Sequence, residues 1–253
     1  MTGGDEVDIR VLGPTEIDVG DRSVVLGGPK QRALLAALVL GEGRVVSIDH
    51  LVDVLWDEAP PSTAITKIQG HVYALRKALA EAGGAGSRII VTRSPGYVMP
   101  SASARIDLTE FDRLSDAART ARTRGELDRA ADLMCTALAL WRGAAFADVP
   151  ALAIQVSVQR LTQRYLVAVE DKAEMDLELG RYRQVLDELD GILEAHPYRD
   201  RLREMQMVSL IRLDRRYEAI ASYRRWRLVL DRDLGIEPCG RLRQLVASIG
   251  YRP

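Results

Sequence analysis

The pattern of apolar and polar positions is clearest between Ser62 and Leu79. The apolar residues of this stretch are spaced three or four positions apart, which places them on one side of a helix: Ile65, Ile68, Val72, Leu75 and Leu79. Ser62 is a favourable N-cap residue, and the Pro60-Pro61 pair before it predicts an abrupt start. The pattern therefore predicts a helix whose apolar face lies on a core.

The opposite wall of this helix is polar, with small residues near its middle. It carries Thr63, Thr66, Lys67, Gly70, Tyr73, Ala74 and Lys77. Small residues admit a bulky partner, hydroxyl groups can bond phosphates or base edges, and lysines can neutralise phosphates. Gln69 and Arg76 lie nearer the core edge, where we expect flanking or phosphate contacts. The alternative is an ordinary solvated helix face.

A β-hairpin is predicted shortly after this helix. In the segment RIIVTRSPGYVMP, two short β-branched and aromatic runs flank Ser94-Pro95-Gly96. Arg93 precedes the turn, where its guanidinium could enter a DNA minor groove and respond to the groove width, or could simply be a solubilising charge. A helix with a polar wall followed by a hairpin with a basic tip is a winged-helix arrangement, and its usual partner is duplex DNA.

The residues before this helix predict a small sheet and two further helices. Three short β-type runs in VDIRVLGPTEIDVGDRSVVLGG are separated by glycine-containing turns. Pro29 is suited to the first turn of a helix, and Ser47 can cap another helix that ends at Trp56. Lys30 and Arg32, near the start of the first of these helices, could touch a DNA backbone because helix N-terminal amides attract phosphate.

The segment Asp57–Pro61 connects the second predicted helix to the third. It is longer than the connection of a minimal helix-turn-helix, and it is acidic and stiffened by proline. These features suit a protein contact as well as a simple linker, so Asp57 and Glu58 are candidates for contacting RNA polymerase.

Composition argues against several other classes of protein. The net charge is −1 and the pI is about 6.3, but residues 60–93 hold a local excess of basic side chains. The segment Gly27-Gly28-Pro29-Lys30 lacks the Gly-x-x-x-x-Gly-Lys-Ser/Thr pattern of a phosphate loop. The three histidines are scattered, and no acidic cluster has metal-ligand spacing. We therefore expect no catalytic site, no metal and no cofactor.

The cysteines and the apolar segments indicate where in the cell the protein is located. Cys135 and Cys239 lie far apart in the sequence, which favours a reducing cytoplasm over a disulfide framework. The dense apolar run Ala33–Leu40 is too short to span a bilayer, and we expect no membrane association.

The second part of the chain is expected to be all helical. The small and proline-containing stretch Pro100–Ala104 is the best domain boundary, which predicts domains of residues 1–103 and 104–253. Asp107 to Glu110 is similar to a capping box, Gly125 separates two helices, and Gly180 ends a long periodic segment.

An internal repeat is present in this half. Leu179-Gly-Arg-Tyr182 recurs as Leu213-Asp-Arg-Arg-Tyr217, with a period of 34 or 35 residues, and the segment from Gly125 is a degenerate third copy. This period fits tetratricopeptide-like helix pairs. The aromatic residues at packing positions of such pairs are expected in the core: Trp141, Tyr182, Tyr217, Tyr223 and Trp226. The basic cluster Arg224, Arg225 and Arg227 could face DNA, the first domain, polymerase or solvent.

The order of these segments resembles the Streptomyces antibiotic regulatory protein family, from Val7 to about Leu245. The resemblance is carried by GGPKQRALLAALVL, LVDVLW, PPSTAITKIQGHVYALRKAL, the hairpin with Gly96-Tyr97, HPYRDRLR and ASYRRWRLVLDRDLGIEP. It implies an α+β OmpR-type winged helix-turn-helix domain followed by an all-α, tetratricopeptide-like bacterial transcriptional activation domain.

The resemblance also implies a function. Members activate secondary-metabolite (antibiotic) biosynthesis genes, bind direct repeats near the −35 element of promoter DNA, usually as two copies, and recruit RNA polymerase through the sigma factor and neighbouring subunits. Because some relatives carry further domains, the chain is either a short member or part of a larger regulator. The alternative function is an interaction scaffold whose winged helix docks protein rather than DNA.

Overall fold

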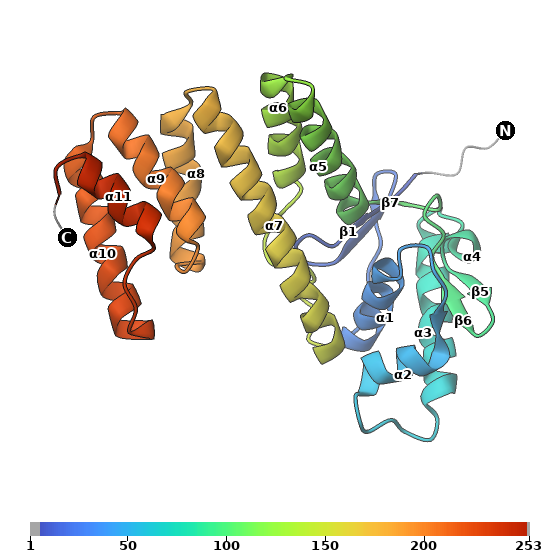
Figure 1. The fold of residues 1–253 in the computed structure, drawn as a ribbon. Helices are drawn as coiled ribbons and strands as arrows, with labels where there is room; N and C mark the ends of the chain where they lie inside the picture. Colours follow the sequence, from blue (N-terminus) through green and yellow to red (C-terminus); the bar gives the residue numbers. More distant parts are fainter. Residues whose placement is uncertain (1–5, 252–253) are drawn as a thin grey trace. The chain divides into compact units, whose positions relative to one another are not determined.

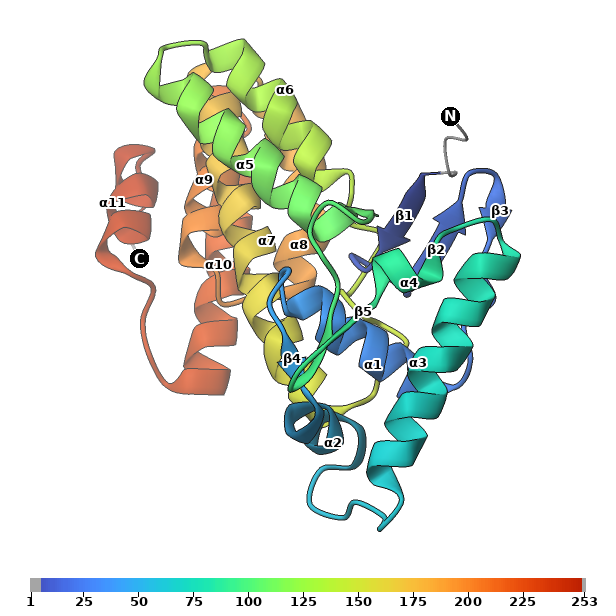
Figure 2. The same cartoon turned by 90° about the vertical axis from the view of Figure 1, so that its right-hand side faces the viewer.

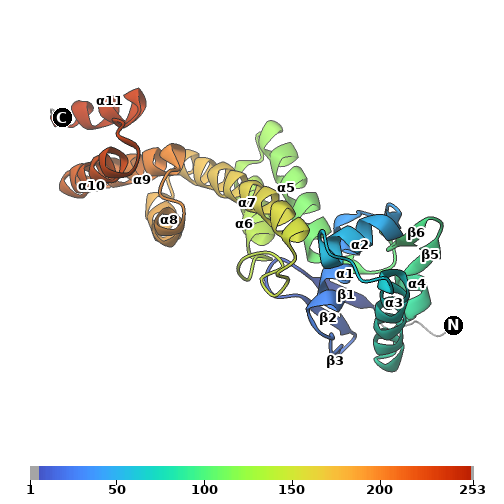
Figure 3. The same cartoon turned by 90° about the horizontal axis from the view of Figure 1, so that it is seen from below.

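The structure is a computed structural model that describes residues 6–251. The chain divides into two compact units (Figure 1). The first comprises the residues up to 116 together with 136–166, and the second comprises 117–135 and the residues from 167 onward. The helices α5 (Asp107–Thr123), α6 (Leu127–Leu138) and α7 (Leu152–Glu178) each contribute residues to both units, and α7 is continuous (Figure 3). The predicted boundary at residue 103 stays a prediction.

The first unit begins with the small sheet that the sequence predicts. β1 (Val7–Arg10) pairs antiparallel with β2 (Glu16–Val19), which pairs antiparallel with β3 (Arg22–Ser23) (Figure 2). A fourth strand, β7 (Arg105–Ile106), joins β1 in parallel. Alternate residues of β1 and β2 are buried, and Ile9 and Ile17 face each other across the pair with 1% exposure. The sheet therefore has one face on the core.

Three helices form the centre of this unit. α1 (Pro29–Leu40) packs against α2 (Ile48–Trp56) and α3 (Ala64–Glu81). Pro29 is at the first turn of α1, and the Ser47 side chain accepts a hydrogen bond from the His50 amide at 3.1 Å, so both predicted helix starts are confirmed. The burial of Leu34, Leu35 and Leu38 makes α1 the core helix.

A short second sheet follows α3. The chain forms α4 (Gly86–Ile89), then β5 (Val91–Arg93) and β6 (Gly96–Val98), which pair antiparallel as the predicted hairpin. β6 also pairs with β4 (Val46–Ser47), giving the strand order β4-β6-β5.

The second unit is built from helices joined by similar turns. α8 (Tyr182–Ala195), α9 (Asp200–Arg212), α10 (Arg216–Leu234) and α11 (Gly240–Ser248) follow α7. Gly125, Gly180 and Asp214 have left-handed φ angles of 78°, 73° and 57°. In each turn the next residue's amide bonds to a carbonyl five positions earlier, as in a Schellman motif. These matching turns lie at the three positions of the predicted repeat.

The core of this unit confirms some of the expected aromatic positions and corrects one. Tyr223 and Trp226 are buried with Met207, Leu242 and Val246. Tyr217 is 90% exposed, so its expected place in the core was wrong. In the first turn of α10 the inward position is taken by Ala219, which is fully buried. Tyr217, two residues earlier, lies on another side of the helix and is left in solvent.

A buried charge network joins three helices of the second unit. The Lys172 ammonium lies 2.6 Å from carboxylate oxygens of both Asp176 and Glu188, and Arg181 lies 3.3 Å from Asp176 and 2.7 Å from Asp128. Asp176 is fully buried, but these two cations compensate its charge. The network fixes α7 against α6 and α8.

Candidate nucleic-acid interface

The outer wall of α3 is the main surface of the candidate interface. The inward stripe of Ile68, Val72, Leu75 and Leu79 is no more than 2% exposed. The residues of the opposite wall are exposed: Thr63, Thr66, Lys67, Gly70, Tyr73, Ala74 and Lys77, with Gln69 beside them. The two faces predicted from the spacing are therefore present, and the exposed wall is free within the first unit to accept a partner.

The start of α3 differs from the prediction. The helix begins at Ala64 with Thr63 as N-cap, so Ser62 is not the cap, and the Thr63 side chain makes no capping hydrogen bond. Ala64 takes the inward position of the first turn at 6% exposure, whereas Ile65 is 53% exposed and not in the core stripe. Ile65 consequently adds an apolar group to the wall, of the kind that contacts thymine methyl groups in a major groove.

Gly70 leaves the middle of the wall open. A Cβ atom added at this position would meet no atom within 4 Å. Packing within the chain therefore does not require glycine here, and glycine in a helix interior costs stability. Its effect is to expose helix backbone to a close partner.

The β5–β6 hairpin is fixed to the helices beside it. Val46 and Ser47 of β4 pair with Tyr97 and Gly96 of β6. A Cβ on Gly96 would lie 1.9 Å from the Val46 carbonyl oxygen, so this close pairing requires glycine. The Ile48 amide bonds to the Pro95 carbonyl at 3.1 Å. Arg93, at the end of β5, is exposed on a hairpin that is held at its tip.

Arg76 joins α3 to this hairpin. Its Nε donates to the Ile90 carbonyl and its Nη2 to the Thr92 hydroxyl, both at 2.9 Å. The guanidinium also lies 5.9 Å from the centre of the Tyr97 ring. Arg76 is therefore engaged within the chain and sets the position of the hairpin relative to α3.

Lys30 and Arg32 are also engaged within the chain. The Lys30 ammonium donates to the Leu55 carbonyl at 2.7 Å and lies 4.5 Å from the centre of the Trp56 ring, so it stabilises the C-terminus of α2. Arg32 pairs with Asp148, and its Nε bonds to the Gly27 carbonyl at 3.3 Å. The geometry joins these two side chains to α2 and to the loop before α7 rather than to the wall of α3.

The α2–α3 connection presents the acidic candidates. Asp57 and Glu58 are both exposed. The Asp57 amide bonds to the Asp53 carbonyl at 2.9 Å, and Asp57 has a positive φ of 50°, which is uncommon outside glycine. Two carboxylates are thus exposed at the C-terminus of α2, in the connection that leads to α3.

Comparison with known proteins identifies the family. Residues 106–249 match the family described as Bacterial transcriptional activator domain, and residues 22–99 match Transcriptional regulatory protein, C terminal. The Regulatory protein DnrI of Streptomyces peucetius is 33% identical over 249 residues, which cover 96% of this chain and 92% of DnrI. The chain belongs to the Streptomyces antibiotic regulatory protein family.

Two further relatives agree with this assignment. The Regulatory protein AfsR of Streptomyces coelicolor is 38% identical over 240 residues, which cover 94% of this regulator but 24% of AfsR. A solved structure of Mycobacterium tuberculosis EmbR in complex with low affinity phosphopeptide has a TM-score of 0.89 and 33% identity, covering 97% of this regulator and 65% of that chain. This regulator thus spans about a quarter of the AfsR proteins that it matches.

The family assignment confirms the predicted fold class. This regulator has an OmpR-type winged helix-turn-helix followed by a helical, tetratricopeptide-like bacterial transcriptional activation domain. Both matched domains are those of transcriptional regulators, and the relatives reported above are named as regulatory proteins rather than as enzymes. Among the described residues, no helix is long and apolar enough to cross a membrane.

One residue near the wall was not assigned a binding role from the sequence of this regulator. His71 has a pKa below its ordinary value, because burial and the nearby Lys30 and Lys67 cations disfavour its charged form. Its uncharged imidazole therefore lies beside the exposed wall of α3. The helical spacing of His71 and Lys67, four positions apart, is the signal that relates them.

Proposed function

We propose that this regulator activates transcription of secondary-metabolite genes by binding tandem direct repeats in promoter DNA near the −35 element. The observation that carries the proposal is the exposed wall of α3, open at Gly70 and fixed by Arg76 to the hairpin that presents Arg93. An α-helix fits into the major groove of B-form DNA.

The residues of the wall have different proposed roles. Lys67 and Lys77 neutralise phosphates, although Lys77 also lies 3.7 Å from Glu81. The side chains that reach base edges or phosphates are Thr63, Thr66, Gln69 and Tyr73, while Gly70 permits close approach. Arg93 enters the adjacent minor groove. Arg76, Lys30 and Arg32 act within the protein by positioning these elements.

The second part of the proposal concerns RNA polymerase. Asp57 and Glu58 lie outside the wall of α3 and are exposed, so they remain accessible when the wall is in a groove. We assign them to contact with the sigma factor or a neighbouring subunit of polymerase. Two copies on tandem repeats would place two such acidic turns beside the promoter.

The test measures DNA affinity against salt. The full chain is titrated onto a fluorescent promoter fragment carrying the repeats and onto a scrambled fragment, at several KCl concentrations. We expect preference for the repeats, and Lys67→Ala or Arg93→Ala should cost about 1–3 kcal/mol of binding free energy if each makes a good groove contact. Arg124→Ala, an exposed arginine in the turn before α6, is the matched control for lost charge. Equal affinity of all variants would contradict the proposal.

The polymerase contact is tested separately. Asp57→Ala and Glu58→Ala should leave the affinity for promoter DNA unchanged and reduce run-off transcription with purified polymerase. If both substitutions leave transcription unchanged, the acidic turn is a linker. If the wild type binds neither fragment specifically but captures a protein partner through α3, the scaffold alternative takes the place of the whole proposal.

A further inference from the structure

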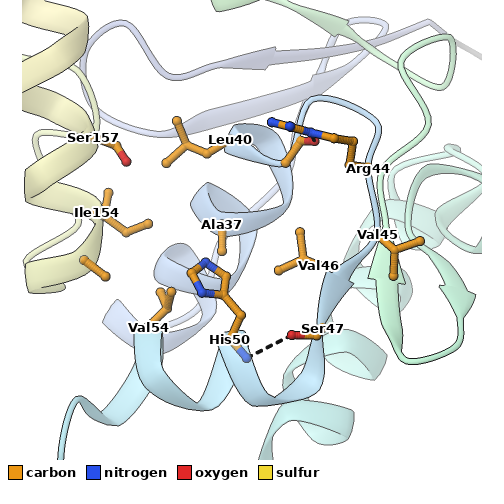
Figure 4. A pocket seen from close by; sticks show the side chains of 12 residues that line it. Ala37, Leu40, Arg44, Val45, Val46, Ser47, His50, Val54, Ile154 and Ser157 are labelled. Carbon is orange, nitrogen blue, oxygen red and sulfur yellow. Dashed lines mark hydrogen bonds between the residues drawn. The ribbon is translucent and has the colours of Figure 1, made fainter.

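A cleft of about 470 Å³ lies within the first unit, on α1, β4, α2 and the first turns of α7 (Figure 4). The floor of the cleft is part of the packed core of the unit. It is formed by four side chains that are at most 7% exposed: Ala37, Val46, Val54 and Ile154. Leu40 extends this apolar surface. The volume lies within the range of sites that bind small organic molecules.

Polar groups surround this apolar lining. Arg44, Ser47, His50 and Ser157 also line the cleft (Figure 4). The Ser47 hydroxyl accepts a hydrogen bond from the His50 amide, which leaves its own proton free to donate. The cleft therefore combines an apolar floor with hydroxyl groups, an imidazole and a guanidinium.

Arg44 is the cation of this cleft, and its own partners hold it weakly. Its Nε lies 3.3 Å from the Gly41 carbonyl, and its Nη2 lies 3.8 Å from the Glu42 carboxylate. Both charged side chains of this pair are more than half exposed, so the pair contributes little. A guanidinium in this situation can turn to a carboxylate and bind it through two parallel hydrogen bonds.

We propose that the cleft binds a small organic anion with an apolar body, and that the occupant changes the affinity of this regulator for promoter DNA. The carboxylate or similar group pairs with Arg44, and the apolar body lies against the partly exposed side chains of Leu40 and Ala153. The regulatory half of the proposal rests on the proposed function, whereas the binding half stands without it.

The link from the cleft to the proposed DNA interface is short. Val46 and Ser47 line the cleft and also form β4, which pairs with β6 of the hairpin. The residue after β4, Ile48, bonds to the Pro95 carbonyl at the hairpin tip at 3.1 Å. An occupant that moves β4 therefore moves the hairpin that carries Arg93. By linkage, DNA must change the affinity for the occupant by the same factor.

The binding half is tested with the dye 8-anilinonaphthalene-1-sulfonate, an aromatic anion, and the purified full chain. 2-Naphthoate and its uncharged analogue 2-naphthylmethanol compete against the dye. We expect naphthoate to displace it, and Arg44→Gln to weaken naphthoate binding about tenfold, as for the loss of one charge-assisted contact. The alcohol should bind equally to wild type and Arg44→Gln. Ser157→Phe fills the cleft and should abolish binding of the dye there, and with it the competition by naphthoate, while Arg124→Gln is the charge control.

The outcomes separate the two halves of the proposal. Thermal melting of each variant first establishes that it is folded, and Arg44→Gln, a change at an exposed side chain, serves if Ser157→Phe does not fold. If Arg44→Gln binds naphthoate as the wild type does, or if naphthoate does not displace the dye, the site is overturned. If the site is confirmed but naphthoate affinity is the same with and without promoter DNA, its regulatory role is overturned. Failure of the wild type to bind DNA would remove the proposed function and leave the dye result intact.

Discussion

The Nη2 atom of Arg76 in α3 donates a hydrogen bond to the Thr92 hydroxyl in β5 at 2.9 Å, and so joins the two elements of the proposed interface. The neighbouring Nε bonds to the Ile90 carbonyl at the same distance. These contacts engage two of the five N–H donors of the guanidinium and direct it toward the hairpin. We propose that Arg76 acts on DNA binding through the position of the hairpin, which would distinguish it from the exposed lysines of the same helix.

This distinction predicts different salt dependences for two substitutions. Arg76→Gln should weaken DNA binding without changing the slope of log affinity against log salt, because it removes no phosphate contact. Lys67→Ala should reduce that slope by about 0.9, the change expected for one neutralised phosphate on duplex DNA. Fluorescence anisotropy at several KCl concentrations gives both values. A reduced slope for Arg76→Gln would show that Arg76 contacts phosphate directly.

Two glycines of the interface should respond in opposite ways to alanine. Gly70→Ala should raise the free energy of unfolding by about 0.5–1 kcal/mol, because the helix gains propensity and the new Cβ meets nothing within 4 Å. The same change should weaken DNA binding, since a methyl group then stands where the groove approaches.

Gly96→Ala is the contrasting case and should lower the free energy of unfolding by about 1–3 kcal/mol, because its Cβ would lie 1.9 Å from the Val46 carbonyl oxygen. Urea denaturation of both variants measures the two stabilities. If Gly70→Ala is stabilised and binds DNA as well as the wild type, the groove does not approach the backbone at this position.

The sequence predicts those parts of the fold that depend on local patterns. The stripe from Ile68 to Leu79 was predictable because the spacing continues over several turns, and the hairpin was predictable from its Ser-Pro-Gly turn. At the N-terminal end of the stripe the periodicity does not decide which of two neighbouring residues faces the core. The sequence favours Ile65, but in the structure Ala64 is the buried residue and Ile65 is exposed.

The partners of charged side chains were not predictable in the same way. Arg76 bonds to residues 14 and 16 positions away, Lys30 to a carbonyl 25 positions away, and Arg32 to a carboxylate 116 positions away. No local period reports such pairs. The cleft is a stronger example, since Ala37 and Ile154 approach it from separate helices that are distant in the sequence.

The stability of the second unit should depend on pH through Glu174. Burial alone would raise the pKa of Glu174, but hydrogen bonds from Arg122, at 2.9 Å, and from Arg201 hold the pKa below its ordinary value. A depressed carboxylate pKa stabilises the folded state above the unfolded value of about 4.3, and this contribution is lost as the pH falls through the folded pKa.

Glu174→Gln should therefore cost about 0.2–1 kcal/mol at pH 7, a range that allows for solvent screening of these partly exposed groups. The difference from wild type should shrink as the pH falls below 4. Urea denaturation at pH 7, 5 and 3.5 measures it, with Glu194→Gln, an exposed carboxylate on α8, as control. A difference that stays constant over this range would exclude the ion pairs as its cause.

The sheet of the first unit should need residues beyond the predicted boundary at 103. The Asp107 carboxylate accepts hydrogen bonds from the Val11 and Leu12 amides at 2.9 Å, and Asp148 accepts from both the amide and the hydroxyl of Thr15 at 2.9 Å. The Phe146 amide also bonds to the Val11 carbonyl at 2.8 Å. A chain cut after residue 103 loses all of these partners.

Residues 1–103 alone should therefore unfold at a lower urea concentration than the first transition of the full chain. Asp148→Ala in the full chain isolates one part of this effect, and should cost about 1–3 kcal/mol because it leaves the buried Thr15 amide without its partner. Asp231→Ala, at an exposed position of α10, is the control. Equal stability of the short chain and the full chain would mean that the winged helix folds independently and that these bonds only dock the loops around Asp107 and Asp148 onto it.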